Sequence, residues 1–228
     1  WYTRFNQLNE SEDIKMDILE TMKARHSVRQ YKNQAIESSK REKINALIKD
    51  VNAESKLSIQ VFYDEPKCFD SFMAHYGKFE NVKNYIAIVG NKNDQEKAGY
   101  YGEKIVLKCQ KLGLNTCWVA MTHGKSKAQI KRGQKLLIII SLGYGETQGV
   151  PHKSKSIAEL GQADQKNEWF EKGMEAVSLA PTAVNQQKFY FELKNGIVTA
   201  KNLGGFYSRI DLGIVKYHFE AVTGHEVK

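Results

Sequence analysis

The longest apolar run of the chain covers residues 136–142 and reads LLIIISL. It is much shorter than the ~20 apolar residues that a helix needs to span a bilayer. A short run rich in isoleucine and leucine is typical of a buried strand. We therefore expect residues 136–142 to form the central strand of a sheet, which must bury its apolar faces against other elements.

Helical and strand patterns alternate along the rest of the chain. Residues 95–112 have apolar positions at helical spacing and end at Gly113, a residue that suits the left-handed turn after a helix. Residues 189–193 and 197–199 read as two strands joined by Asn195-Gly196, a strong hairpin signal. The other predicted elements are helices at 17–23 (capped by Asp17), from a cap at Ser38 or Ser39 through Val51, at 164–179 and at 210–222, and strands at 57–63 and 85–89.

These elements predict one domain of the α+β class, with helices on both faces of a sheet. The 228 residues contain no Pro-rich linker, repeat or low-complexity stretch. The aromatic segment at residues 69–79 fits no single pattern. Met16 opens a segment that reads like a natural start. Residues 1–15 are therefore expected to be an N-terminal extension, and residues 16–228 the folded domain.

Charge and cysteine content narrow the classes of function. The formal net charge of +8 raises the hypothesis of a nucleic-acid-binding protein. The lysines are scattered and accompany no nucleic-acid motif, so a solvated basic surface that also attracts phosphorylated small molecules is the preferred interpretation.

Three widely spaced cysteines without a C-x-x-C pair predict neither a disulfide framework nor a metal site. A polar N-terminus without an apolar leader predicts a cytoplasmic protein.

The first candidate binding segment follows the first predicted helix and reads Arg25-His26-Ser27-Val28-Arg29. Guanidinium groups hold phosphate oxygens in bidentate fashion, and a serine hydroxyl adds a neutral donor. The alternative is an ordinary basic helix C-terminus, where cations interact favourably with the helix dipole. The segment is therefore a candidate phosphate site, through Arg25, His26, Ser27 and Arg29.

The second candidate segment is rich in amides and reads APTAVNQQ over residues 180–187. Asn and Gln side chains each offer a donor and an acceptor, which suits the edge of a planar heterocycle or a polyol chain. The alternative is a plain helix stop followed by a polar loop. The candidate residues of this segment are Pro181, Thr182, Ala183, Asn185 and Gln187.

Two weaker segments complete the candidate site. Residues 113–119 read GLNTCWV and are followed by Ala120 and Met121; the alternative here is core packing where a helix meets a strand. The strand end LGYG is followed by Lys153 and Lys155, which alone would be an ordinary solvated pair.

The glycines of residues 143–149 do not form a dinucleotide-binding site. Their spacing differs from G-x-G-x-x-G, Pro151 follows them, and no strand-turn-helix pattern surrounds them. The sequence therefore excludes a Rossmann site at this position.

Taken together, the segments resemble the FMN-binding segments of the nitroreductase family. The family carries R-[RH]-S-x-[RK] after its first helix, A-P-S-[AS]-x-N-x-Q-P-W at a helix end, G-L-G-T-C-W-[ILV] at a strand, and L-G-Y with a basic pair downstream. Residues 211–220 (DLGIVKYHFE) resemble a D-[LI]-G-[IM]-x-x-x-H-[FL]-E helix of the subgroup in which the amide element lies late in the chain. The resemblance covers roughly Met16 to the C-terminus, and His218 within it is expected to be a buried structural residue.

The resemblance implies an α-β-α sandwich with a mixed, mostly antiparallel sheet and FMN as the cofactor. Residues of the first segment and the downstream basic pair would hold the phosphate and ribityl groups: Arg25, Ser27, Arg29, Lys153 and Lys155. Residues of the amide segment would contact the flavin or shape the loop beside it: Pro181, Thr182, Ala183, Asn185 and Gln187. The backbone of Ala120 and Met121 would lie near the flavin N5.

The resemblance also implies an oxidoreductase that works in ping-pong order. NAD(P)H would reduce FMN by hydride transfer, and an electron-poor acceptor such as a nitroaromatic or a quinone would then take its place. The expected partners are small molecules, with no nucleic acid and no membrane, and the FMN site is expected within one chain of a monomer or a homodimer. Lys188-Phe189 replaces the usual Pro-Trp, and Ala120-Met121 stands where Gly is frequent. These departures leave open the alternative of a flavin-binding or regulatory protein without turnover.

Overall fold

The computed structural model describes residues 17–228, so the extension expected at residues 1–15 lies outside the described residues. One sheet consists of β1 (Ser58–Phe62), β2 (Asn84–Gly90), β4 (Lys135–Gly143) and β3 (Asn115–Val119), in that spatial order. All neighbouring strands in it are antiparallel. The apolar run at residues 136–142 lies in β4, which has a partner on each side. The predicted central strand is therefore confirmed.

Side chains of β4 alternate between two buried faces, as the period of a strand requires. Ile138 and Ile140 lie in the main core, whereas Ile139 lies in a second cluster on the opposite face. That second cluster includes Phe69 and Phe79, which flank the short helix α4 (Phe72–Tyr76). The segment at residues 69–79, for which the sequence predicted no element, thus covers one face of the sheet.

A second, three-stranded sheet is formed by β5 (Gly161–Ala163), β6 (Phe189–Lys194) and β7 (Ile197–Asn202). β5 runs parallel to β6, and β6 and β7 form the predicted antiparallel hairpin. Asn195 and Gly196 at its turn have φ values of 51° and 74°, as a two-residue hairpin loop requires. The α+β class and the mostly antiparallel pairing are confirmed, but the strands divide between two sheets where the sequence predicted one.

The main helices are α2 (Ile18–Ala24), α3 (Ser38–Ser55), α5 (Gln95–Lys111), α7 (Glu168–Ser178) and α8 (Ser208–Thr223), and α6 (Ile157–Leu160) is short. Asp17 caps α2 as predicted. Ser38 is the first residue of α3, and Glu37 is its N-cap, so the predicted serine cap is wrong. α7 starts after Asn167, later than predicted, because β5 pairs with β6 and the Asp164 carboxylate accepts a hydrogen bond from Asn195 N at 2.8 Å.

No helix among the described residues has the length and apolar character that crossing a membrane requires.

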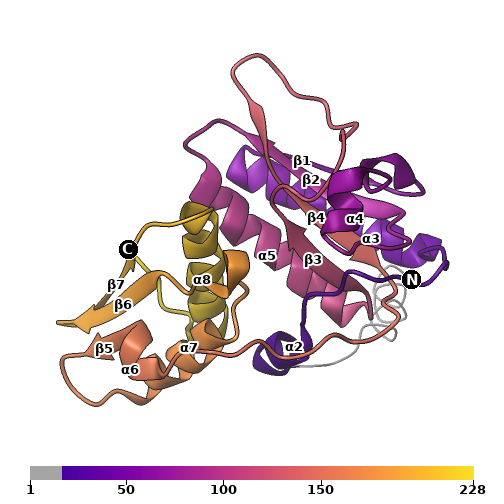
Figure 1. Cartoon of the computed structure of the whole chain (residues 1–228). Coiled ribbons are helices and arrows are strands. Elements are labelled where there is room, and N and C mark those ends of the chain that lie inside the picture. Colours follow the sequence, from indigo (N-terminus) through magenta and orange to yellow (C-terminus); the bar gives the residue numbers. More distant parts are fainter. Residues whose placement is uncertain (1–16) are drawn as a thin grey trace, which may run out of the picture.

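The two sheets are connected through the helices α5 and α8, which lie side by side between them (Figure 1). Gly99 of α5 faces the backbone carbonyl of Ile210, and Gly213 of α8 faces the backbone carbonyl of Glu96. A Cβ atom at either glycine would overlap the facing carbonyl. The two glycines therefore allow the helix backbones to approach closely.

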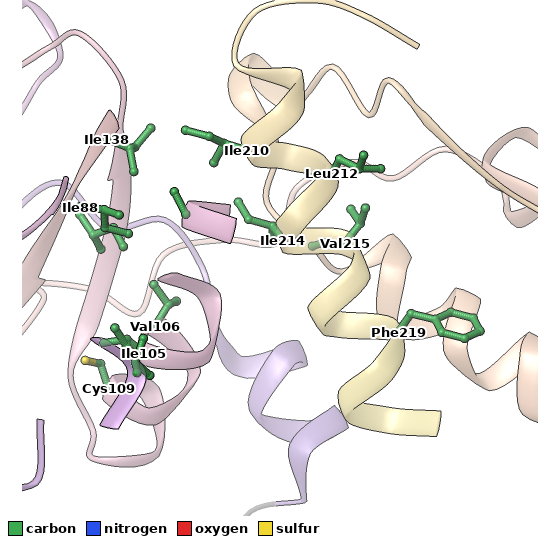
Figure 2. Packing of buried hydrophobic residues seen from close by; sticks show 14 of the residues in the cluster. Ile88, Ile105, Val106, Cys109, Ile138, Ile210, Leu212, Ile214, Val215 and Phe219 are labelled. Carbon is green, nitrogen blue, oxygen red and sulfur yellow. The ribbon is translucent and has the colours of Figure 1, made fainter. Parts of the chain in front are cut away.

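α8 is buried on two sides. Figure 2 shows Ile210 and Ile214 on the side of α8 that faces Ile138 of β4, and Phe219 on the other side. The ring of Phe219 stacks with Phe191 of β6 at a centroid distance of 5.4 Å. α8 is thus shared by the cores of both sheets, which is why apolar side chains lie on two sides of this helix.

Candidate cofactor site

Two adjoining cavities lie where residues 25–29, the end of β3 and the start of α8 meet. The first has a volume of about 290 Å³, and we call it the apolar cavity; its lining is Ser27, Arg29, Cys117, Trp118, Ala120, Met121, Thr122, Ile138, Pro181, Thr182, Ala183, Val184, Phe206, Ile210, Asp211 and Ile214. The second has a volume of about 280 Å³, and we call it the basic cavity; its lining is Arg25, His26, Ser27, Arg29, Val150, His152, Pro181, Thr182, Val184 and Asn185. The five residues that the cavities share make them neighbours in one site.

The segment that carries Arg25 is held against the edge of the four-stranded sheet. Val28 N donates to Thr116 O at 3.0 Å, and Ser27 forms a parallel bridge with Thr116 of β3. Arg25 is the C-cap of α2, so the helix ends just before the segment becomes extended. This geometry brings Ser27 and Arg29 into both cavities.

Arg25 is a buried cation whose hydrogen-bonding capacity is largely unused. Its side chain is 3% exposed, and its Nε lies 3.9 Å from Glu103 Oε1, which is too long for a hydrogen bond. Nε and Nη1 have no hydrogen-bond partner among the described residues. Burial lowers the pKa of Arg25, and the charge of Glu103 opposes that shift. A buried guanidinium with free donors at a cavity wall suits an anionic ligand.

Glu103 connects Arg25 to the core and to the apolar cavity. Trp118 Nε1 donates to Glu103 Oε2 at 2.9 Å, and Trp118 also lines the apolar cavity. His218 Nε2 lies 3.0 Å from Glu103 Oε1, and His218 Nδ1 donates to Ala176 O at 2.8 Å. Burial opposes ionisation of Glu103, but its contacts with His218, Arg25 and Trp118 outweigh burial and lower its pKa. His218 is fully buried, in agreement with its expected structural position.

The amide segment forms the wall opposite Arg29 and has a strained backbone. Val184, Asn185 and Gln187 have φ values of 46°, 53° and 46°, in the left-handed region that non-glycine residues seldom adopt. The carboxylate of Asp211 accepts a hydrogen bond from Ala183 N at 2.9 Å and one from Gln186 Nε2 at 2.7 Å. These bonds fix the strained loop to the first turn of α8.

Asn185 and Gln187 bind the loop between β4 and α6, residues 144–156, which we call the strap. The strap contains the predicted basic pair. Asn185 Nδ2 and Gln187 Nε2 each donate to Lys153 O at 2.9 Å. Lys155 N donates to Gln187 Oε1 at 2.8 Å, and Lys155 Nζ donates to Gln187 O at 3.0 Å. The amide of Gln187, which is 4% exposed, is therefore occupied by contacts within the protein.

The structure brings most of the predicted residues together and leaves three outside. Gln187, Lys153 and Lys155 line neither cavity, and both lysine side chains are exposed. The other ten candidates line one or both cavities: Arg25, His26, Ser27, Arg29, Ala120, Met121, Pro181, Thr182, Ala183 and Asn185.

Several lining residues were not predicted from the sequence. Asp211 belongs to residues 211–220, which resemble a helix of the family but were given no binding role. His152 directly precedes Lys153, for which a binding role was predicted. Phe206, Val184 and Val150 carry no signal in the sequence, because an apolar residue in a loop is ordinary. Cys117 and Trp118 belong to the segment for which core packing was the alternative to a binding role, and the structure places them both in the core and at the cavity wall.

Comparison with known proteins identifies the family. The family model described as "Putative TM nitroreductase" matches residues 17–223, nearly the whole described chain. The chain therefore belongs to this nitroreductase family. No curated relative matches the sequence.

Three solved structures resemble this chain over different shares of its length. One from Thermotoga maritima MSB8, described as a "putative nitroreductase", has a TM-score of 0.67 and 24% identity, and the match covers 91% of this chain and 83% of that one. An FMN-dependent nitroreductase from Clostridium difficile R20291 has a TM-score of 0.45 and 22% identity, covering 61% of this chain and 92% of that one. A nitroreductase family protein from Streptococcus pneumoniae TIGR4 has a TM-score of 0.49 and 12% identity, covering 62% and 96%. The first of these likenesses shows that the chain has a nitroreductase fold.

Proposed function

We propose that this chain is an FMN-dependent oxidoreductase of the nitroreductase type. It would use NADH or NADPH to reduce electron-poor acceptors such as nitroaromatics or quinones. Family membership supports the oxidoreductase class, and the pairing of a basic with an apolar cavity supports FMN. The pairing is the observation that carries the proposal, because FMN joins a phosphate to an apolar ring system through a polar chain.

The basic cavity fits the phosphate. Arg25 and Arg29 supply guanidinium groups, and two nitrogens of Arg25 have no other partner. Ser27 and Thr182, which both carry hydroxyls, line the two cavities. In this proposal the arginines hold the phosphate, and the hydroxyls contact the ribityl chain.

The apolar cavity fits the ring system. Trp118, Ile138 and Pro181 give it flat or aliphatic walls that exclude water, and Ala120 and Met121 follow directly after β3. Asp211 is the one carboxylate among the described lining residues. Bound FMN would supply the redox centre that takes a hydride from NAD(P)H and passes electrons to the acceptor.

The three predicted residues that line neither cavity, Gln187, Lys153 and Lys155, have a different role in this proposal. Gln187 holds the strap at Lys153 and Lys155 through three hydrogen bonds. Its Nε2 also donates to Asn185 Oδ1 at 2.9 Å, which fixes the position of Asn185. We therefore assign positioning rather than ligand contact to Gln187 and to the two lysines.

Within one chain, the basic cavity joins Arg25 of the first segment to Asn185 of the amide segment, and this supports an FMN site within a single polypeptide. If the site is intrachain, FMN affinity should not change when the protein is diluted below the concentration at which any dimer persists. Affinity that falls together with the dimer fraction, measured by fluorescence titration and analytical ultracentrifugation, would contradict the intrachain site.

The absorbance spectrum of the purified protein tests the proposal directly. We expect a yellow protein, or one whose tryptophan fluorescence is quenched by FMN with micromolar or tighter affinity. Anaerobic stopped-flow mixing with NADH or NADPH should then bleach the flavin, and a quinone should restore its colour. If the protein binds FMN but NADH and NADPH do not bleach it, the protein is a flavin-binding protein without turnover. If the protein does not bind FMN, the proposal as a whole is contradicted.

A further inference from the structure

His152 lies at the wall of the basic cavity, on the strap between β4 and α6. The predicted basic pair follows it in sequence, but Lys153 and Lys155 are exposed and line neither cavity. The cation-forming group that the strap places in the cavity is therefore an imidazole. Unlike a lysine, an imidazole changes its charge near neutral pH.

The hydrogen bonds of His152 fix which nitrogen is available. Nε2 lies 3.0 Å from Ser178 O, a carbonyl that can only accept, so Nε2 carries the hydrogen. The hydroxyl of Ser154 donates to the same carbonyl at 2.6 Å and lies 3.2 Å from Nε2. Nδ1 has no hydrogen-bond partner among the described residues. Protonation of His152 would thus place a free N–H donor on Nδ1.

The surroundings keep His152 mostly neutral while the basic cavity holds no anion. Burial lowers its pKa, the Ser178 carbonyl raises it, and the charges of Arg25 and His218 lower it. His26, across the cavity, also has a lowered pKa, first through burial and then through Arg25 and His152. No carboxylate lies among the described residues that line this cavity, because Glu103 is placed behind Arg25.

One feature favours the protonated form. Ser178 is the last residue of α7, so His152 lies at a helix C-terminus, where the dipole stabilises a cation. Repulsion by Arg25 opposes this effect. An anion held by Arg25 would neutralise that repulsion, and the balance would then shift toward protonation.

We infer that His152 is an anion-binding residue of the basic cavity that takes up a proton when a phosphate monoester binds. The inference rests on the proposed function, since FMN supplies the phosphate. Protonated His152 donates Nδ1–H toward the phosphate, while Nε2–H stays on the Ser178 carbonyl. By linkage, the affinity for the phosphate must then fall as the pH rises through the pKa of His152 in the complex.

The test compares FMN with riboflavin, which has the same ring and chain but no phosphate. From about pH 6.5 to about pH 8.5 the phosphate is largely dianionic, so a change in affinity reports on the protein. FMN affinity should fall roughly tenfold over that range, and riboflavin affinity should stay within about twofold. Titration calorimetry at about pH 7 in two buffers of different ionisation enthalpy should show proton uptake with FMN and none with riboflavin.

His152→Gln isolates the residue, because the Gln amide can still donate to the Ser178 carbonyl but cannot be protonated. This variant should lose most of the pH dependence and of the proton uptake, and its FMN affinity near pH 6.5 should fall several-fold. Lys172→Ala is the matched control, since it removes an exposed cation of α7 that lines neither cavity, and it should behave as wild type. His26→Gln tests the second imidazole and should retain a pH-dependent affinity.

The outcomes separate the inference from the function. FMN binding that is independent of pH, or a loss of pH dependence in Lys172→Ala but not in His152→Gln, would overturn the inference and leave the FMN proposal intact. A protein that binds neither FMN nor riboflavin at any pH would overturn both.

Discussion

Arg25 and Glu103 form an ion pair that is almost fully inside the protein, with exposed fractions of 3% and 0%. Glu103 also contacts His218 and Trp118, so one carboxylate faces two groups that are or can become cations and one indole donor. Such a carboxylate compensates charges that are costly to bury alone. The ion pair therefore links the wall of the basic cavity to the helix packing of the core.

Glu103→Gln should destabilise the fold by about 3–5 kcal/mol, because the buried Arg25 loses its counter-charge. Urea denaturation at neutral pH measures the change. Glu54→Gln is the matched control: Glu54 accepts from Tyr101 and Lys104 at the surface and should change stability by less than about 1 kcal/mol. Equal, small losses in the two variants would show that the buried pair is not needed.

Gly213→Ala should destabilise the fold by about 3 kcal/mol or more, because the added methyl group overlaps the Glu96 carbonyl at the helix crossing. Arg209→Ala, on the exposed side of the same helix, is the control and should stay within about 0.5 kcal/mol. Thermal unfolding followed by circular dichroism gives both values. A stable Gly213→Ala protein would mean that α5 and α8 can separate without cost.

Arg29→Ala should weaken FMN binding by roughly tenfold to a hundredfold and riboflavin binding much less, because it removes a charge-assisted contact to phosphate. Arg41→Ala controls for general effects. Arg41 likewise lies over an aromatic ring, that of Tyr63, as Arg29 lies over Phe79, but it lines neither cavity. Equal losses for FMN and riboflavin in Arg29→Ala would show that Arg29 does not contact the phosphate.

Asp211 makes stability depend on pH in mildly acidic solution. It is 5% exposed, and burial raises its pKa from 3.8 to about 6, although Gln186 and the Ala183 amide oppose the shift. The folded protein keeps this proton between about pH 4 and about pH 6, whereas the unfolded chain has released it. The contribution of Asp211 to stability therefore falls as the pH rises through this window, by about 3 kcal/mol in total.

The comparison with Asp211→Asn isolates this contribution. The difference in unfolding free energy between wild type and variant should change by about 2–3 kcal/mol from about pH 4 to about pH 6.5, in favour of wild type at the acidic end. A constant offset is also expected, because an Asn amide facing Gln186 Nε2 places two donors together. Parallel stability curves would contradict the raised pKa.

The sequence predicted the long elements better than their arrangement. The helix that ends at Gly113 and the Asn195-Gly196 hairpin were predictable because a glycine with positive φ marks each of them. The start of α7 was not, because β5 depends on pairing with a strand that lies 30 residues later in the chain. The division into two sheets is likewise a property of long-range pairing, which local periodicity does not encode.

The candidate site shows the same limit. Arg25, Ser27 and Pro181 were found because charge, hydroxyl groups and a helix stop are visible in the sequence. The roles of Gln187 and the two lysines were not, since a free donor and one occupied by Lys153 O look alike in sequence. His152 becomes visible only when the end of α7 brings the Ser178 carbonyl to it, and Asp211 only when the amide segment brings Ala183 N to it.

The cavities combine Arg25, near the start of the chain, with Asp211, near its end. During synthesis, the chain must therefore leave the ribosome as far as α8 before the binding site exists. The four-stranded sheet can form earlier, but Trp118 and Ile138 would stay uncovered until α8 packs against it. Ligand binding would then follow the packing of α8, and it would stabilise the contact between the segment of Arg25 and the segment of Asp211. A shortage of the ligand should accordingly appear as faster degradation of chains that already include α8, not of shorter nascent ones.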